Sequence, residues 1–199
     1  MFDKTKKIEL RIMSGGHKAC VVRFPTDAEW RARARAQRTM REHLGRGKSQ
    51  YRVLNADDAN ADLFVQIRVD KDGPEFDAAE ASAAIARLER WEPGDSEREG
   101  DTYRIRAKVP GAQVVYVLRM PKQSEMAAFS RASMRVIEGR RSQELRFFLE
   151  PGEELFDKLL VSSEGYAEAG GVPAIHKDAA VNELLAQIAE DTEEDDPEA

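Results

Sequence analysis

Residues 15–42, GGHKACVVRFPTDAEWRARARAQRTMRE, have a counterpart at residues 111–138, GAQVVYVLRMPKQSEMAAFSRASMRVIE. Nine of the 28 aligned positions are identical, whereas chance would give about two in a window of this composition. Three identical pairs are chemically distinctive: Arg23/Arg119, Pro25/Pro121 and Glu29/Glu125. The stretch therefore predicts that one structural unit occurs twice, in tandem.

Net charge alternates along the 199-residue chain in step with this repeat. Four successive segments have net charges of +9 (1–55), −9 (56–102), +7 (103–149) and −13 (150–199). The segment EPGDSEREGD at 92–101 is rich in charge and turn formers, and it predicts a linker. We therefore divide the chain into three parts: a first unit over 1–98, a homologous second unit over 99–188 and a disordered acidic tail over 189–199.

Each unit is predicted to be a β-hairpin, a charged helix, a short strand and a further helix, which makes the fold class α+β. The first charged helix is predicted to begin after Thr26, which forms a capping box with Glu29, and to stop at Gly45. Its counterpart is predicted to stop at Gly139 and to be buried. The short strands are expected at QYRVL (50–54) and at ELRFFL (144–149), with RFFL in the core. The two hairpins are expected to pair into one pseudo-symmetric sheet with the helices packed on it.

The acidic segments are predicted to be largely helical. NADLFVQIRVDKDG favours a short helix from Asn60 or Asp62, although LFVQIRV also fits a strand. A second helix is predicted with Asp77 as its N-cap, and its counterpart is predicted to begin near Asp178.

The stretch GRGKSQ at 45–50 has the look of a phosphate-binding loop, and GRRSQ at 139–143 answers it. A Walker A loop would need glycine at position 42, where Glu42 stands, and a carboxylate repels phosphate. The predicted order, a helix before the loop and a strand after it, is also the reverse of that motif. We therefore expect a helix stop followed by a basic turn, without a nucleotide site.

Five arginines crowd the first charged helix, and they admit two interpretations. They could bind nucleic acid, or they could pair with the acidic residues of the same chain. We favour pairing, because the charge wraps around the helix and the net charge of the chain is −6. Trp30 fits an interface anchor or a core residue, and its counterpart Met126 favours the core. The candidate interaction surface consists of Trp30, Arg31, Arg35, Arg38, Arg46, Lys48, Arg140 and Arg141.

The sequence shows no constellation of catalytic or metal-binding residues. The histidines His17, His43 and His176 are isolated, and Cys20 lies in a predicted strand, where a small core residue is the better interpretation. We expect no enzymatic activity, metal, cofactor or small-molecule ligand. No apolar run reaches the roughly 18 residues of a membrane span, and one cysteine favours a cytoplasmic location.

The phrase VRFPTDAEWRARARAQRTMREHLGRGKS resembles uncharacterised phage and prophage proteins. The plan of a hairpin, FPT and a charged helix is similar to the tail-assembly chaperones of tailed phages. That resemblance implies a cytoplasmic protein that binds the tape-measure protein during tail building and has no catalytic residues. We thus expect a non-enzymatic assembly or structural-interaction protein whose partner is another protein or a second copy. The alternative is a nucleic-acid-associated protein that uses the basic turns at 45–48 and 139–141.

Overall fold

The computed structural model describes residues 1–12, 18–45, 48–138, 143–167 and 171–194, which form helices and strands of an α+β fold, as predicted. The first half contains β1 (Lys7–Ile12), β2 (Lys18–Arg23), α1 (Asp27–Ala36), β3 (Thr39–Gly45), β4 (Lys48–Val53), α2 (Ala56–Ile67) and α3 (Ala78–Leu88). Two short strands follow, β5 (Glu92–Pro93) and β6 (Glu97–Glu99). The second half contains β7 (Thr102–Val109), β8 (Ala112–Arg119), α4 (Gln123–Ala132), β9 (Met134–Glu138), β10 (Gln143–Phe147), α5 (Glu150–Leu159), β11 (Leu160–Glu164) and α6 (Ala174–Glu194).

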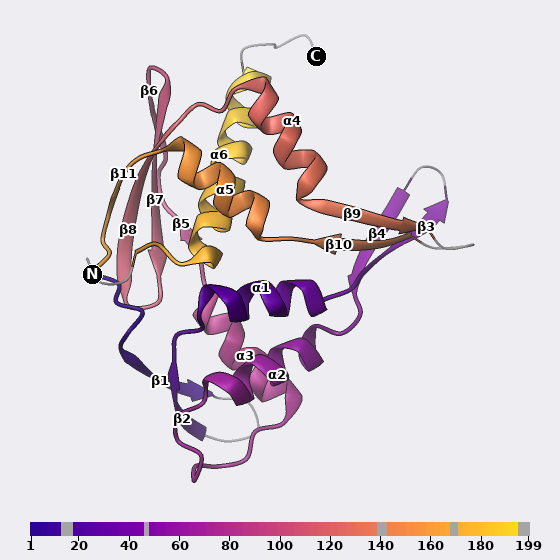
Figure 1. Cartoon of the computed structure of the whole chain (residues 1–199), viewed down its shortest axis with the longest axis vertical. Helices are drawn as coiled ribbons and strands as arrows, with labels where there is room; N and C mark the ends of the chain where they lie inside the picture. The colour runs from indigo at the N-terminus through magenta and orange to yellow at the C-terminus, as the bar shows by residue number, and fades with distance from the viewer. Residues whose placement is uncertain (13–17, 46–47, 139–142, 168–170, 195–199) are drawn as a thin grey trace.

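Within the described ranges, the strands form three antiparallel sheets (Figure 1). One is the β1–β2 hairpin, and another has the order β11-β8-β7-β5, with β6 also paired to β7. The third has the order β4-β3-β10-β9 and takes one hairpin from each half. The prediction that the two leading hairpins share a sheet is therefore wrong. The second hairpins join the halves instead, because β3 pairs with β10.

Both halves present the same order of elements: hairpin, helix, hairpin, helix, a single pairing segment and a final helix. The pairing segment is the Val22↔Arg68 bridge in the first half and the β11–β8 pairing in the second. The identical Arg–Glu pairs also form identical contacts, since Arg23 binds Glu29 and Arg119 binds Glu125. Common origin by duplication stays a prediction, while the shared order of elements is observed directly.

The charged helices are shorter than predicted. Helix α1 has the predicted capping box, in which the Thr26 amide donates to the Glu29 carboxylate at 2.8 Å. It ends at Ala36, however, and α4 ends at Ala132, so the predicted stops at Gly45 and Gly139 are wrong. The residues that follow each helix form strands, in which β-branched side chains such as Thr39, Val136 and Ile137 are favoured.

Several other boundaries differ from the sequence predictions. Helix α2 begins at Ala56, before either predicted start, whereas α3 has the predicted Asp77 cap. The predicted linker contains β5 and β6, which pair with β7. Helix α6 begins at Ala174 and continues to Glu194, so residues 189–194 are helical rather than disordered. The hydroxyl of Tyr103 donates to the carboxylate of Asp191 at 2.7 Å and holds this last part of α6 against β7.

A single hydrophobic core extends through both halves. Trp30 and Ile85 from the first half and Tyr116 and Phe156 from the second are fully buried in it. Cys20 is also buried, as predicted. None of the helices in the described ranges is long and apolar enough to cross a membrane.

Candidate protein interaction surface

The sheet β4-β3-β10-β9 projects from the body of the molecule (Figure 1). Its central seam pairs Thr39 with Leu145 and Met40 with Glu144. Directly paired residues of antiparallel strands point to the same face of a sheet, and neighbours along a strand point to opposite faces. The register therefore sorts the side chains of this sheet into two faces.

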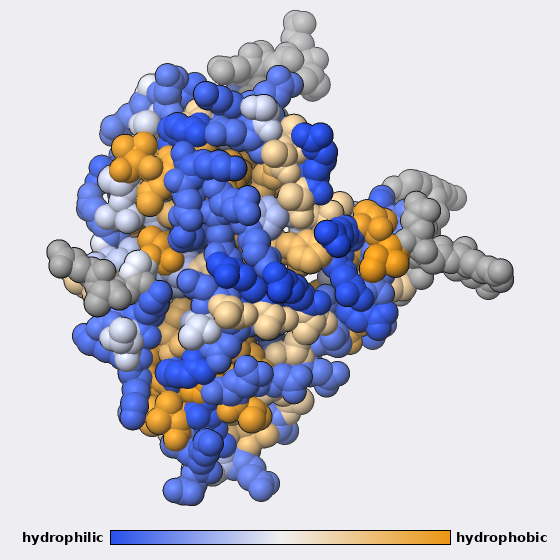
Figure 2. Space-filling view, in the orientation of Figure 1, coloured by the Kyte–Doolittle hydropathy of each residue, from blue (hydrophilic) through white to orange (hydrophobic). Residues whose placement is uncertain are grey.

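One face is apolar, and we call it the apolar face. It consists of Tyr51, Val53, Met134, Val136, Leu145 and Phe147, together with Thr39 and Arg41. Val53, Val136 and Phe147 are each 46–47% exposed, and Tyr51 is 57% exposed. Five of the eleven exposed large hydrophobic residues in the described chain lie on this face. Apolar groups over the sheet are visible in Figure 2. Clustered exposed apolar groups of this kind are typical of a contact surface.

The opposite face carries charged side chains beside Met40 and the half-exposed Ile137, and its ion pairs reinforce the seam. The Glu144 carboxylate accepts hydrogen bonds from Arg38 Nη2 at 2.6 Å and from Arg146 Nε at 3.0 Å. The hydrogen bond from Arg38 holds the pKa of Glu144 below its ordinary value. Since Arg38 belongs to the first half and Glu144 to the second, this contact joins the two hairpins.

The structure separates the predicted surface residues into four groups. Trp30 is fully buried, with its ring 5.9 Å from that of Phe24, so the core interpretation is confirmed and it forms no part of a surface. Arg31, Arg35 and Arg38 pair with Glu153, Glu150 and Glu144, which confirms the favoured pairing within the chain. Three positions lie outside the described residues: Arg46, Arg140 and Arg141. Of Lys48 only the backbone is described, as the first residue of β4.

Sequence patterns do not predict the apolar face, because they favour helices over the residues of β3 and β9. Phe147 was expected in the core, yet it is 47% exposed, and in the same strand only Leu145 is buried. Val136 and Ile137 were likewise expected on a buried helix and are half exposed. The sequence signal for this hairpin is the glycine-containing stretch GRGK at 45–48, which lies between two segments that can form strands.

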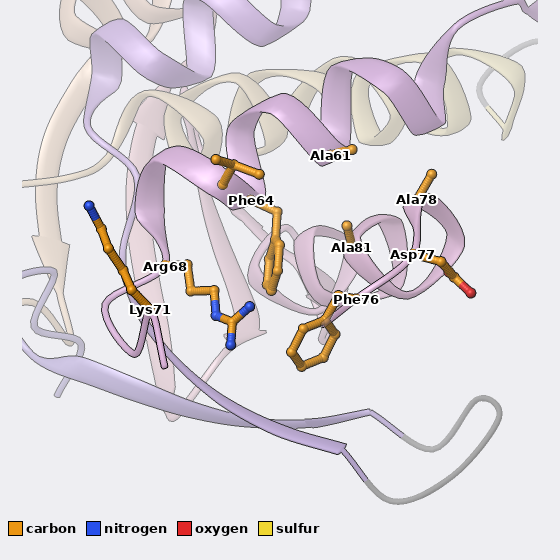
Figure 3. Close-up of a pocket in the computed structure, with 9 residues that line it drawn as sticks. Ala61, Phe64, Arg68, Lys71, Phe76, Asp77, Ala78 and Ala81 are labelled. Carbon is orange, nitrogen blue, oxygen red and sulfur yellow. The ribbon is translucent and has the colours of Figure 1, made fainter. Parts of the chain in front are cut away.

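A groove lies between α2 and α3, with a volume of about 420 Å³. Figure 3 shows the rings of Phe64 and Phe76 beside it, with Arg68 at one end. The Arg68 guanidinium lies 5.0 Å from the centre of the Phe76 ring, and its Nε is 3.1 Å from Asp70. Nine residues line this groove: Ala61, Phe64, Val65, Arg68, Lys71, Phe76, Asp77, Ala78 and Ala81. Most of these residues are apolar, and the charged side chains among them are Arg68, Lys71 and Asp77.

His176 is buried where the two halves meet. Its Nδ1 is 2.9 Å from the Tyr166 hydroxyl, and its ring lies edge-on to those of Phe2 and Phe24. Burial lowers the pKa of His176 to about 4, so the imidazole is neutral at physiological pH. Burial also raises the pKa of Tyr166. These groups form a structural junction.

In the ranges that the structure describes, no three His, Cys, Asp or Glu side chains are grouped to hold a metal ion. Comparisons with protein-family models, with curated proteins and with solved structures found no match to this chain. The resemblance to phage tail-assembly chaperones and the expected lack of enzymatic activity both stay predictions.

Proposed function

We propose that the protein is a non-enzymatic assembly factor that binds another protein through the apolar face of the projecting sheet. The observation that carries this proposal is the half-exposed cluster of Val53, Val136 and Phe147 on one sheet face. A partner that covers these side chains removes them from water. Burial of apolar surface contributes about 25 cal/mol of favourable free energy per Å². Protein interfaces have such apolar centres surrounded by polar rims.

The apolar face suits a specific contact. Arg41 lies on the apolar face itself, 5.9 Å from the centre of the Tyr51 ring. Tyrosine and arginine are enriched among residues that contribute most to binding. The surface therefore combines an apolar centre with groups that give orientation.

Nucleic-acid binding is the weaker alternative. Four α1-region arginines, Arg31, Arg33, Arg35 and Arg38, already contact carboxylates of the same chain. The basic turns that this alternative needs lie mainly outside the described residues. Retention on heparin at low salt, lost steeply as salt rises, would favour it.

The proposal is tested by co-expression with candidate partners, starting with the products of neighbouring genes and any tape-measure protein among them. A triple variant, Val53→Ser, Val136→Ser and Phe147→Ser, should weaken the complex at least about tenfold. The measurement is the dissociation constant, with hydrogen exchange locating the covered residues.

The matched control carries Val65→Ser and Val161→Ser, which change exposed valines away from the projecting sheet. This control should bind like the original protein. A complex that the triple variant forms with unchanged affinity would overturn the proposed surface.

A further inference from the structure

The two hairpins of the projecting sheet correspond residue by residue. The Leu54 amide donates to the Arg38 carbonyl at 2.8 Å, and the Phe148 amide donates to the Ser133 carbonyl at 3.0 Å. Each hydrogen bond closes the base of its hairpin. It lies one residue beyond the last strand pair, which is Thr39–Val53 in the first hairpin and Met134–Phe147 in the second. Counting inward, β9 corresponds to β3 and β10 corresponds to β4. Met134 thus corresponds to Thr39, and Leu145 corresponds to Tyr51.

The seam between the hairpins is head-to-tail. Strand β3, the first of its hairpin, pairs with β10, the second of the other. In this contact, the outer edge of the first strand in one hairpin (β3) pairs with the outer edge of the second strand in the other hairpin (β10). The two remaining edges are β4, which corresponds to β10, and β9, which corresponds to β3. The molecule thus presents at its two free edges the same two complementary elements that already bind each other inside the chain.

Residues at the β3–β10 seam are more buried than the corresponding residues in the outer strands β4 and β9. At the seam, Leu145 is 4% exposed and its partner Thr39 is 8% exposed. Their counterparts at the free edges are Tyr51, which is 57% exposed, and Met134, which is 38% exposed. The free-edge residues are large and apolar, although a solvent-facing edge is normally protected by charge, proline or a bulge. Neither β4 nor β9 contains proline, although each strand carries charge, Arg52 in β4 and Arg135 in β9, and the β3–β4 pairing shifts register between His43 and Gly45.

We propose that β9 of one copy pairs with β4 of a second copy and so repeats the β3–β10 seam between molecules. This inference rests on the proposed function, because it names a partner for the same sheet. Transferring the observed register places Tyr51 opposite Met134 of the neighbouring copy, Gln50 opposite Arg135 and Ser49 opposite Val136. The strands remain antiparallel, and the apolar faces of the two copies become continuous.

The repeat of a head-to-tail contact has a geometric consequence. Each copy offers one β4 edge and one β9 edge, so addition does not stop at a dimer. A closed ring forms if the rotation between copies closes, and an open filament forms if it does not. Assembly through a continuous sheet is thus available to this chain without any other protein.

The contact between copies is weaker than the seam inside the chain. The internal seam includes the carboxylate of Glu144 between Arg38 and Arg146. In the contact between copies, the corresponding residue is Gln50, which stands between Arg52 and the neighbour's Arg135 without a carboxylate. A few strand pairs bury a small area, and small interfaces belong to the weak, transient class. Concentration should therefore govern assembly.

Sedimentation velocity from about 10 μM to about 1 mM tests the proposal on the full chain. The original protein should form species larger than a dimer as concentration rises. Two variants each remove one edge: Tyr51→Glu at β4 and Met134→Glu at β9. Both positions are exposed, so folding should be retained, and thermal unfolding checks this.

The decisive measurement is mixing. Each variant alone should remain monomeric, because each lacks one of the two complementary edges. An equimolar mixture should form a one-to-one dimer and nothing larger, since one intact β9 and one intact β4 remain. A double variant with both changes should bind neither single variant, which makes it the matched control.

Three results would overturn the proposal. The original protein could stay monomeric at about 1 mM. The Tyr51→Glu variant alone could still dimerise, which would indicate symmetric β9–β9 pairing. The mixture could fail to associate although both variants are folded. If any of these occurs while a partner protein still binds the apolar face, the proposed function stands and only the inferred partner fails.

Discussion

The β7–β8 hairpin and the projecting sheet have similar alternating sequences but opposite environments. In the body, Tyr103, Ile105 and Tyr116 are at most 2% exposed, and α5 and α6 pack over this sheet (Figure 1). In the projecting sheet, Val136 and Phe147 are almost half exposed. Both regions therefore form strands with two distinct faces, whereas burial depends on whether a helix covers the apolar face.

This difference separates stability from interaction. Side chains of the body sheet are already removed from water, so their apolar surface stabilises the fold. Side chains of the apolar face retain contact with water, so much of their apolar surface remains for a partner. The comparison is open to direct test by changing the same residue type in each region.

The largest expected difference is between two isoleucines. Ile105→Ala, at a fully buried site in β7, should lower the free energy of unfolding by about 2–5 kcal/mol, because it leaves a cavity. Ile137→Ala, at a site 47% exposed in β9, should change it by no more than about 0.5 kcal/mol. Urea unfolding of both variants checks this, and similar losses at both sites would contradict the distinction between the two regions.

The next effect concerns pH and should be confined to the body. The pKa of His176 falls from 6.5 to about 4 in the folded chain, so its contribution to stability is lost as pH falls from about 6.5 to 4. That loss is at most about 3 kcal/mol. The variant His176→Phe has no group that titrates in this range, so this part of the pH dependence of stability should disappear. Urea unfolding between pH 4 and pH 7 measures it.

Asp178 provides a control of opposite sign. Burial raises the pKa of this carboxyl from 3.8 to about 6, so its effect on stability becomes unfavourable as pH rises from about 4 to 6. Asp178→Asn should therefore steepen the rise in stability with pH, whereas His176→Phe should flatten it. The same direction of change in both variants would contradict the assignment.

Parts of the fold could be predicted because their signals are local. The capping box of Thr26 and Glu29 and the N-cap Asp77 identify helix starts through hydrogen bonds within four residues. The burial of Cys20 follows from its place in an apolar strand. Chain order alone also indicated that the two halves have a similar succession of elements.

Other parts depended on contacts between residues distant in sequence. The strand at Thr39 is stabilised by pairing with Leu145, 106 positions away, and no local pattern within TMREH specifies that partner. Local patterns therefore predict longer helices over the residues of β3 and β9, although they predict strands at β4 and β10. Tertiary pairing overrode helix propensity at these positions.

A pair of arginines extends the comparison to ionic contacts. Arg33 in the body is 9% exposed and binds Asn60 and Glu89, whereas Arg38 beside the projecting sheet is 51% exposed. Arg33→Ala should cost about 1–3 kcal/mol, because buried polar partners are left unpaired. Arg38→Ala should cost less than about 1 kcal/mol, because water replaces the lost contact. Equal losses in thermal unfolding would indicate that the projecting sheet is as tightly integrated as the body.

The smallest expected effect refines the contact between copies. Glu42 and Gln50 are paired across the β3–β4 hairpin, so the double variant Glu42→Gln and Gln50→Glu exchanges them without changing net charge. The exchange moves a carboxylate to the position that corresponds to Glu144, opposite Arg135 of the next copy. One favourable cross-strand pair contributes about 0.2–1 kcal/mol, so the dissociation constant should fall by up to about fivefold, most clearly at low salt. Adding Arg135→Gln should abolish the gain. An exchange that weakens association would show that β4 meets β9 in a different register, because only the transferred register brings position 50 to Arg135.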